Sequence, residues 1–236
     1  MSGNIIEISG LNTYYGQSQI LRNINLKVEK GSITTIMGRN GVGKSTLLKA
    51  ITGLLKATSG NVKFKEEDIT SSPGYLRAKA GIGYVPQGRE IFPKLTVFEN
   101  LRLGLQARRD KVSKVPEEEI YALFPVLGQM KKRLGGNLSG GQQQQLAIGR
   151  ALVGKPDVLL LDEPTEGIQP SIIDDIEDVL KKLKKSGEYT ILLVEQSLEF
   201  AREVTEHYFV MERGTVVLEG KAEDLSDDQI KNYLAF

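Results

Sequence analysis

The fold of this chain is most tightly constrained by eight consecutive residues that form a glycine-rich loop after an apolar run and before a helical pattern. The apolar, β-branched run at residues 32–37 predicts a short strand, and the helical pattern at 45–52 stops at Gly53. The loop matches the template G-x-x-x-x-G-K-[ST] with Gly38, Arg39, Asn40, Gly41, Val42, Gly43, Lys44 and Ser45. A strand, such a loop and a helix in this order predict an α/β fold in which the loop surrounds an anion.

The loop predicts a cradle for nucleotide phosphates. Its glycines let the backbone turn successive N–H groups inward, and the helix adds the positive end of its dipole. We expect Lys44 to reach the β- and γ-phosphates and the Ser45 hydroxyl to bind Mg²⁺, with Thr46 also holding phosphate. The alternative is a glycine-rich turn with a surface lysine.

A second apolar run, at residues 158–161, ends in two adjacent acids, Asp162 and Glu163. A buried strand is not expected to end in unpaired charges, because desolvating them costs free energy. Beside a phosphate cradle, Asp162 can hold the magnesium shell, and Glu163 can polarise an attacking water as general base. The alternative is two solvated acids at the end of a strand.

Composition and charge narrow the classes of function. The 236 residues include 31 Lys and Arg against 30 Asp and Glu, which gives no electrostatic reason to expect nucleic acid as a partner. Cysteine is absent, which excludes a disulfide framework and cysteine-based metal sites. The N-terminal residues MSGNIIEISG lack the features of a signal peptide, and no apolar stretch approaches the roughly 18–20 residues that span a bilayer. We expect a soluble protein that reaches a membrane only through a partner.

Short apolar runs alternate with helical patterns along much of the chain, which predicts a mostly parallel sheet covered on both faces. The expected strands lie at residues 5–8, 24–28, 32–37, 61–65, 81–85, 158–161 and 190–194, with a closing hairpin at 208–211 and 216–218. A helical block between about 96 and 153 interrupts this alternation. We expect one domain over residues 1–236, with its core at about 1–87 and 155–236 and a helical subdomain at about 88–154.

The segment LSGGQ, which lies between the phosphate loop and the strand that ends in Asp-Glu-Pro, resembles the signature of the ATP-binding cassette (ABC) ATPases. Ser139 and the glycine N–H groups after it are expected to cap a helix and form an anion site. The resemblance implies a P-loop NTPase core, an N-terminal antiparallel β subdomain and an inserted α-helical subdomain. It also implies a head-to-tail dimer in which the γ-phosphate of ATP on one subunit is contacted by the other subunit's Ser139, Gly140, Gly141 and Gln142.

Two further positions take their expected roles from this resemblance. Tyr15 matches the aromatic residue that stacks on adenine, although an ordinary loop tyrosine is the alternative. Gln87 matches the loop glutamine that approaches magnesium and the attacking water, although a glutamine here could also be a plain turn residue. Because the Gln87 loop joins the core to the helical insertion, it would relay the nucleotide state to a docked partner.

Two positions depart from the commonest family pattern. Gln169 stands where an aspartate often supports communication across the dimer, and Gln196 stands where many members carry a histidine. A glutamine amide can still donate a hydrogen bond to the γ-phosphate, but it does not titrate near neutral pH. We interpret Gln196 as a catalytic contact that is insensitive to pH, and His207 as a surface residue before the next strand.

Three local features resemble the shorter ATP-binding subunit of branched-chain amino acid importers: PQGREIF with TVFENL, EGIQP, and the ending VEQ. We also expect no regulatory extension, because the sequence given ends at Phe236, as that subunit does. The resemblance implies ATP, Mg²⁺, transmembrane permease subunits and a second ATPase subunit, identical or different. It further implies a periplasmic or extracellular substrate-binding protein that acts indirectly, and a location on the cytoplasmic side of the plasma membrane. Three alternatives stay open: a transporter of urea or other amides, a poorly hydrolysing switch, and a cassette ATPase of DNA repair or translation.

Overall fold

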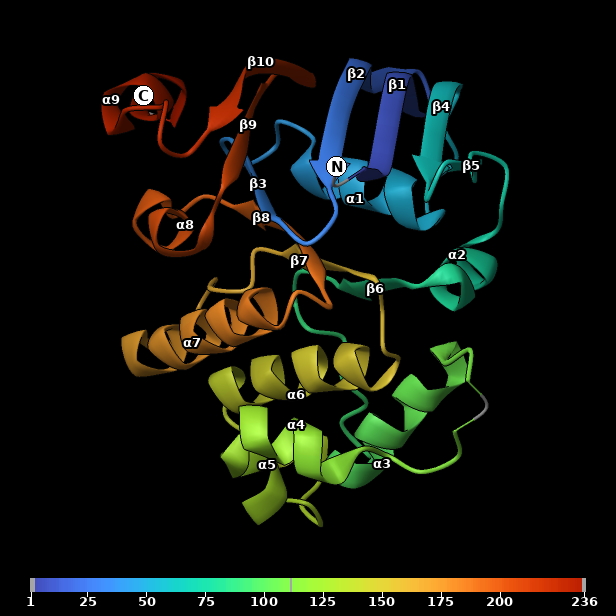
Figure 1. Cartoon of the computed structure of the whole chain (residues 1–236), viewed down its shortest axis with the longest axis vertical. Coiled ribbons are helices and arrows are strands. Elements are labelled where there is room, and N and C mark those ends of the chain that lie inside the picture. Colours follow the sequence, from blue (N-terminus) through green and yellow to red (C-terminus); the bar gives the residue numbers. More distant parts are fainter. Residues whose placement is uncertain (1–2, 111, 235–236) are drawn as a thin grey trace.

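The computed structural model describes residues 3–110 and 112–234 and contains two sheets (Figure 1). The expectations about the first residue, Met1, and the last, Phe236, concern positions outside the described residues. The first sheet is antiparallel, in the order β2-β1-β4-β5. Its strands are β1 (Asn4–Tyr15), β2 (Ser18–Glu29), β4 (Ser59–Phe64) and β5 (Glu67–Asp68). This sheet confirms the expected N-terminal antiparallel subdomain.

The second sheet has the order β10-β9-β3-β8-β7-β6 and is mostly parallel. Its strands are β3 (Ile33–Met37), β6 (Ile82–Val85), β7 (Val158–Asp162), β8 (Thr190–Glu195), β9 (His207–Glu212) and β10 (Thr215–Lys221). Only the pairing of β9 with β10 is antiparallel among the pairs in this sheet, which confirms the predicted hairpin. The carboxyl ends of β3, β7 and β8 therefore lie side by side, and the predicted nucleotide residues follow all three.

Both faces of the second sheet are buried. Leu160 and Leu192 belong to a core that they share with helix α1 (Lys44–Thr52) and the antiparallel sheet. Leu159 and Leu193, one residue along the same strands, belong to a second core with helices α6 (Gly140–Val153) and α7 (Pro170–Ser186). Strands buried on both faces read as continuous apolar runs, which is why the sequence reveals them clearly.

The helical region between β6 and β7 lies below the second sheet in Figure 1. It consists of α3 (Val97–Leu103), α4 (Glu117–Leu123), α5 (Pro125–Gln129), α6, and the 3₁₀ turns η1 (Gly104–Ala107) and η2 (Gly135–Asn137). The other helices are α2 (Gly74–Ala80), α8 (Leu198–Val204) and α9 (Asp227–Leu234). This arrangement confirms the inserted helical subdomain as a feature of the fold, while the residue numbers given for its limits stay a prediction.

Several elements differ from the sequence-based expectation. Strands β1 and β2 are each 12 residues long, because their ladder continues through register shifts beyond the polar residues that end the apolar pattern. The short elements β5, α2 and α9 were not predicted, since brief or strongly polar segments have weak periodicity. His207 begins β9 and is half-buried, with its ring 4.9 Å from that of Phe209, so it is less exposed than a free surface residue.

Within residues 3–110 and 112–234, no helix combines the length and the apolar character needed to cross a lipid bilayer.

Candidate nucleotide-binding site

The loop between β3 and α1 has a backbone that only glycine adopts easily. Gly41 and Gly43 have φ values of 82° and 109°, in the region that disfavours side chains. A Cβ at Gly38 would lie 2.6 Å from the carbonyl oxygen of Met211, so the loop also passes too close to β9 for a side chain. The predicted glycine positions are thus required by the geometry, and the loop turns its backbone around the start of α1 as an anion cradle requires.

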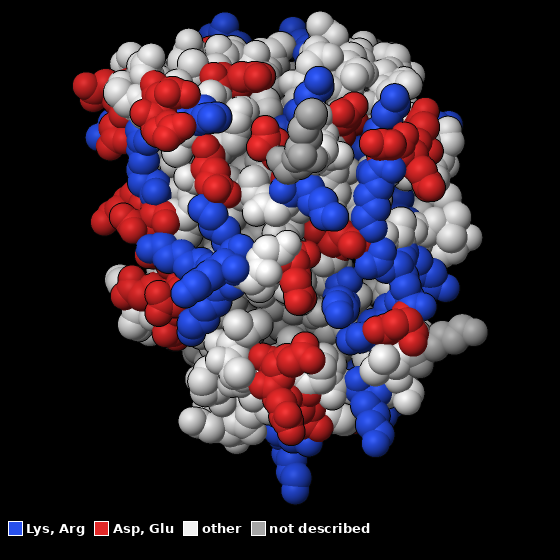
Figure 2. All heavy atoms as spheres, viewed as in Figure 1, with Lys and Arg blue, Asp and Glu red and all other residues white. Residues whose placement is uncertain are grey.

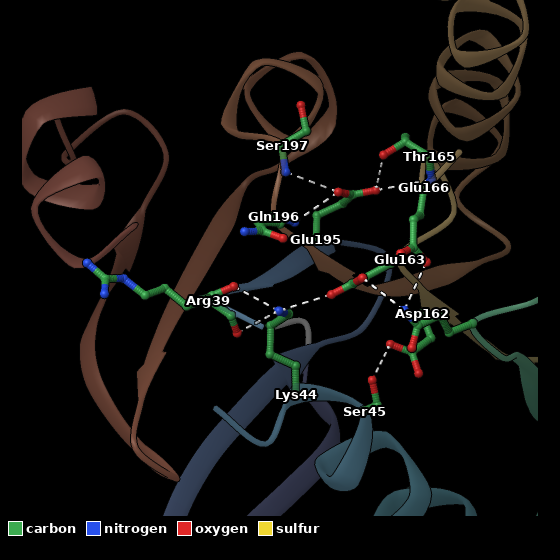
Figure 3. A network of polar contacts seen from close by, with 12 residues as sticks. Arg39, Lys44, Ser45, Asp162, Glu163, Thr165, Glu166, Glu195, Gln196 and Ser197 are labelled. Carbon is green, nitrogen blue, oxygen red and sulfur yellow. Dashed lines mark hydrogen bonds and ion pairs between the residues drawn. The ribbon is translucent and has the colours of Figure 1, made fainter. Parts of the chain in front are cut away.

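Lys44 is buried beneath this loop. Its Nζ donates to the carbonyl oxygens of Gly38 at 2.8 Å and Arg39 at 3.1 Å. The same ammonium is 3.0 Å from Oε1 of Glu163, and both side chains are at least nine-tenths buried (Figure 3). The cation is therefore held between the glycine loop and the second acid of β7, where it can meet phosphate oxygens that enter the loop.

Asp162 faces the first turn of α1. Its Oδ1 accepts a hydrogen bond from Ser45 Oγ at 2.9 Å, and its Oδ2 accepts one from the Tyr84 hydroxyl at 3.2 Å. Burial raises the pKa of Asp162, and these two hydrogen bonds oppose that effect. Burial and the nearby Asp162 carboxylate also raise the pKa of Tyr84. A converging hydroxyl and carboxylate are hard oxygen ligands of the kind that Mg²⁺ prefers, so the pair fits the predicted metal.

Glu163 is held in a strained backbone conformation beside Gln87. Its φ is 47°, which is uncommon for a residue other than glycine, and its N–H donates to the carbonyl oxygen of Val194 at 2.9 Å. Gln87 Nε2 donates to Glu163 Oε2 at 3.3 Å and to Glu166 Oε2 at 2.8 Å. The structure thus brings the predicted base and the predicted loop glutamine together, with Glu166 as a partner that the sequence did not indicate.

The carboxylate of Glu195 lies between the loop after β7 and the start of α8 (Figure 3). It accepts hydrogen bonds from Thr165 and from the backbone N–H groups of Gln196 and Ser197. Burial raises the pKa of Glu195, and the hydrogen bonds work against that effect. Sequence reasoning missed this residue, although an acid at the end of an otherwise apolar strand was a signal that could have identified it.

Tyr15 stands at the mouth of the site. It is 48% exposed at the end of β1 and lines a cavity of about 300 Å³. The other lining residues are Ile20, Asn40, Gly41, Gly43, Lys44, Ser45, Thr46, Gln87 and Glu163. An exposed ring at the edge of a phosphate cradle is suitably placed to stack on a base, so the position fits the predicted adenine contact.

The signature residues lie apart from this cavity and contribute none of its lining among the described residues. Ser139 is the N-cap of α6: its Oγ accepts from the N–H of Gln142, and the Gln142 side chain accepts from the N–H of Ser139. This capping box confirms the predicted cap. The anion that the cap would bind stays a prediction, and within one chain it is not the anion held by the Lys44 loop.

Comparison of the chain with known proteins identifies similar proteins. A family model described as ABC transporter matches residues 21–166. The high-affinity branched-chain amino acid transport ATP-binding protein BraG of Pseudomonas aeruginosa is 38% identical over 214 residues, 91% of each chain. The probable branched-chain amino acid transport ATP-binding protein LivF of Archaeoglobus fulgidus is 40% identical over 219 residues, 93% of each chain.

A solved structure has the same fold. It is the dimeric, post-hydrolysis state of an ATP-binding cassette bound to ADP and Pi, with a TM-score of 0.82 and 30% identity. The likeness covers 92% of this chain and 98% of that one.

Proposed function

The chain belongs to the ABC transporter family and binds and hydrolyses ATP; from this premise we propose that it powers the import of branched-chain amino acids through a membrane permease. The support for this cargo is that BraG and LivF, whose names state branched-chain amino acid transport, match more than nine-tenths of the chain. The segments that indicated the shorter importer subunit include VEQ, which stands at the carboxyl end of β8. The protein would act on the cytoplasmic side of the membrane, attached through the permease.

The proposed hydrolysis uses groups that already converge on the cradle. Lys44 and the N–H groups of the glycine loop bind the phosphates, and Tyr15 stacks on adenine. Ser45 and Asp162 would hold Mg²⁺, with Gln87 close by, and that ion would neutralise charge on the phosphates when bound. Phosphoryl transfer depends on such positioning and charge stabilisation more than on covalent chemistry.

Glu163 is the proposed general base. Its carboxylate is 3.0 Å from Lys44 and 3.3 Å from Gln87, so it would lie beside the γ-phosphate of an ATP molecule bound in the glycine loop. Gln196, at the end of β8, would donate to the γ-phosphate through its amide. Ser139 and the residues up to Gln142 would contact the nucleotide of a second ATPase subunit.

A groove beside α2 is the proposed docking surface for the permease. A cavity of about 550 Å³ lies between α2, β6, η1 and α6, and Leu54, Tyr75 and Phe92 on its rim are 66%, 66% and 51% exposed. Apolar side chains exposed together mark interaction sites. Tyr84 lines the same groove and donates a hydrogen bond to Asp162. A permease segment docked in the groove would therefore be linked through Tyr84 to the proposed magnesium ligand Asp162.

The experiment that tests this function is co-purification of the chain with the permease subunits encoded beside it, followed by ATPase assays in reconstituted vesicles. We expect leucine, isoleucine or valine, with the matching binding protein, to stimulate ATP hydrolysis. Stimulation by urea or small amides instead would assign the chain to that related class of importer. ATPase activity that no cargo changes would contradict the transport role.

A further inference from the structure

Glu195 is a buried acid whose hydrogen-bonding capacity is filled from two different loops. Its side chain lies at the end of β8, and the residue is 2% exposed. Oε1 accepts from Thr165 Oγ1 at 2.6 Å and from the Thr165 N–H at 3.3 Å. Oε2 accepts from the N–H groups of Gln196 at 2.9 Å and Ser197 at 3.2 Å. The carboxylate therefore joins residues that are 30 positions apart in the chain.

The two loops that Glu195 joins carry the proposed catalytic groups. Thr165 lies between Glu163 and Glu166, both of which contact Gln87. On the other side, Glu195 binds the backbone of Gln196 itself and of the residue that caps α8. A change at Glu195 would thus move the base loop relative to the Gln196 loop.

Packing alone does not call for an acid at this position. Burying a carboxylate costs free energy, and a neutral or apolar side chain would fill the end of an apolar strand more cheaply. A carboxylate differs from an amide because both of its oxygens only accept hydrogen bonds. It can therefore hold donors from both loops at once, whereas a glutamine would turn its NH₂ group toward one set of donors.

We propose that Glu195 is a positioning residue that holds Gln196 and the Glu163 loop in one geometry for ATP hydrolysis. The proposal rests on the proposed roles of Glu163 and Gln196, and not on the identity of the cargo. Displacing a reacting group by about 1 Å can lower a rate by roughly 100-fold, so losing this link should affect turnover more than nucleotide binding.

The test compares Glu195→Gln with the matched pair Thr165→Val and Thr165→Ser. Valine keeps the shape of threonine but loses the hydroxyl that donates at 2.6 Å, and serine keeps it. We expect Glu195→Gln to lower kcat about 10- to 100-fold and Thr165→Val to lower it about 3- to 10-fold, with KM within about threefold in each. Thr165→Ser should restore most of kcat, and affinity for a fluorescent ATP analogue should stay near that of the wild type.

The double variant shows whether the two residues act as one unit. If Thr165 acts through Glu195, adding Thr165→Val to Glu195→Gln should lower kcat by less than about twofold more, since coupled residues are not additive. The proposal would be overturned if the losses of kcat in the two single variants multiplied in the double variant. It would also be overturned if Glu195→Gln had an unchanged kcat. A variant that loses kcat only in proportion to its unfolded fraction in thermal melts would assign Glu195 a purely structural role.

Two controls keep this result separate from the proposed function. If Glu195→Gln does not fold, the Thr165→Val and Thr165→Ser pair still tests the link. If Glu163→Gln hydrolyses ATP normally, the assignment of Glu163 as the base fails. The proposal that Glu195 positions the Glu163 loop for hydrolysis then fails with it. A normal Glu195→Gln enzyme beside an inactive Glu163→Gln enzyme would overturn the positioning role alone.

Discussion

At the scale of single residues, the environment of Glu163 carries the most information about chemistry. A non-glycine residue with φ of 47° costs free energy, and such strain is tolerated mainly where function requires a particular geometry. Its carboxylate lies between a cation and an amide, 3.0 Å from Lys44 and 3.3 Å from Gln87. This position suits a base that must be held against a substrate carrying negative charge.

We predict that Glu163→Gln lowers ATP turnover at least about 100-fold, because an amide cannot accept the proton from the attacking water. Nucleotide affinity should remain within a few-fold of the wild type, since the glycine loop is unchanged. Phosphate release and binding of a fluorescent ATP analogue measure the two quantities. Glu166→Gln is the matched control: Glu166 accepts from the same Gln87 but is exposed, so its loss should be far smaller.

The pKa of Glu195 gives a prediction about stability and pH. Burial raises this pKa above its ordinary value of 4.5 in the folded protein. Such a group contributes stability that is fully present below about pH 4.5 and is lost as pH rises through the raised value. The free energy of unfolding of the wild type, minus that of Glu195→Gln, should therefore fall as pH rises from 4.5. Urea unfolding at several pH values measures the difference, and a difference that grows with pH would contradict the assignment.

At the scale of elements, the helix that begins with Lys44 and Ser45 depends on α2 for its other end. Arg77 is 3% exposed, and its Nη1 donates to the carbonyl oxygens of Ala50 and Ile51, each at 2.8 Å. Its Nε and Nη2 also donate to backbone carbonyls. The last carbonyls of a helix lack partners within the helix, so this guanidinium closes the C-terminal end of α1.

We predict that Arg77→Leu lowers the free energy of unfolding by about 3 kcal/mol, because it removes the four hydrogen bonds that the buried guanidinium donates to backbone carbonyls. Arg102→Leu is the control. Arg102 is an exposed arginine in the last turn of α3, where the same change should cost less than about 0.5 kcal/mol. Equal losses in the two variants, measured by urea unfolding, would show that α1 does not depend on the Arg77 contacts.

At the scale of the whole molecule, the two predicted anion sites of one chain lie apart from each other. The Lys44 cradle lies at the carboxyl ends of the parallel strands, and the Ser139 cap belongs to α6 in the helical region. On the face shown in Figure 2, acidic and basic side chains are interspersed, in keeping with the near-zero net charge of +1. This face therefore offers no patch of a single charge to an oppositely charged partner.

We predict that Glu163→Gln with ATP and Mg²⁺ forms a stable dimer, and that adding Ser139→Ala weakens it. Thr96→Ala in the same background is the matched control, because Thr96 caps α3 with the same kind of capping box. Each change should cost roughly 1 kcal/mol of helix stability, but only the loss of Ser139 should lower dimer content in sedimentation experiments. Equal dimer loss in both variants would remove Ser139 from the interface.

The features that sequence reasoning identified correctly are short-range. The glycine loop, the apolar strands buried on both faces and the cap at Ser139 each depend on a few neighbouring residues, so their patterns survive in the sequence. The bulged strands β1 and β2 were underestimated because their continuation depends on pairing with other strands.

By itself, the sequence therefore determined the glycine loop between a strand and a helix, the mostly parallel sheet, the two acids of β7 and the family. Only the tertiary structure decided which side chains those acids meet. Ser45 reaches Asp162 across 117 positions, and Thr165 reaches Glu195 across 30. The physical reason is that an acid at the end of an apolar strand can be recognised in the sequence as a buried carboxylate that needs hydrogen-bond donors. The donors themselves come from distant segments, which only the order of the strands in the sheet brings together.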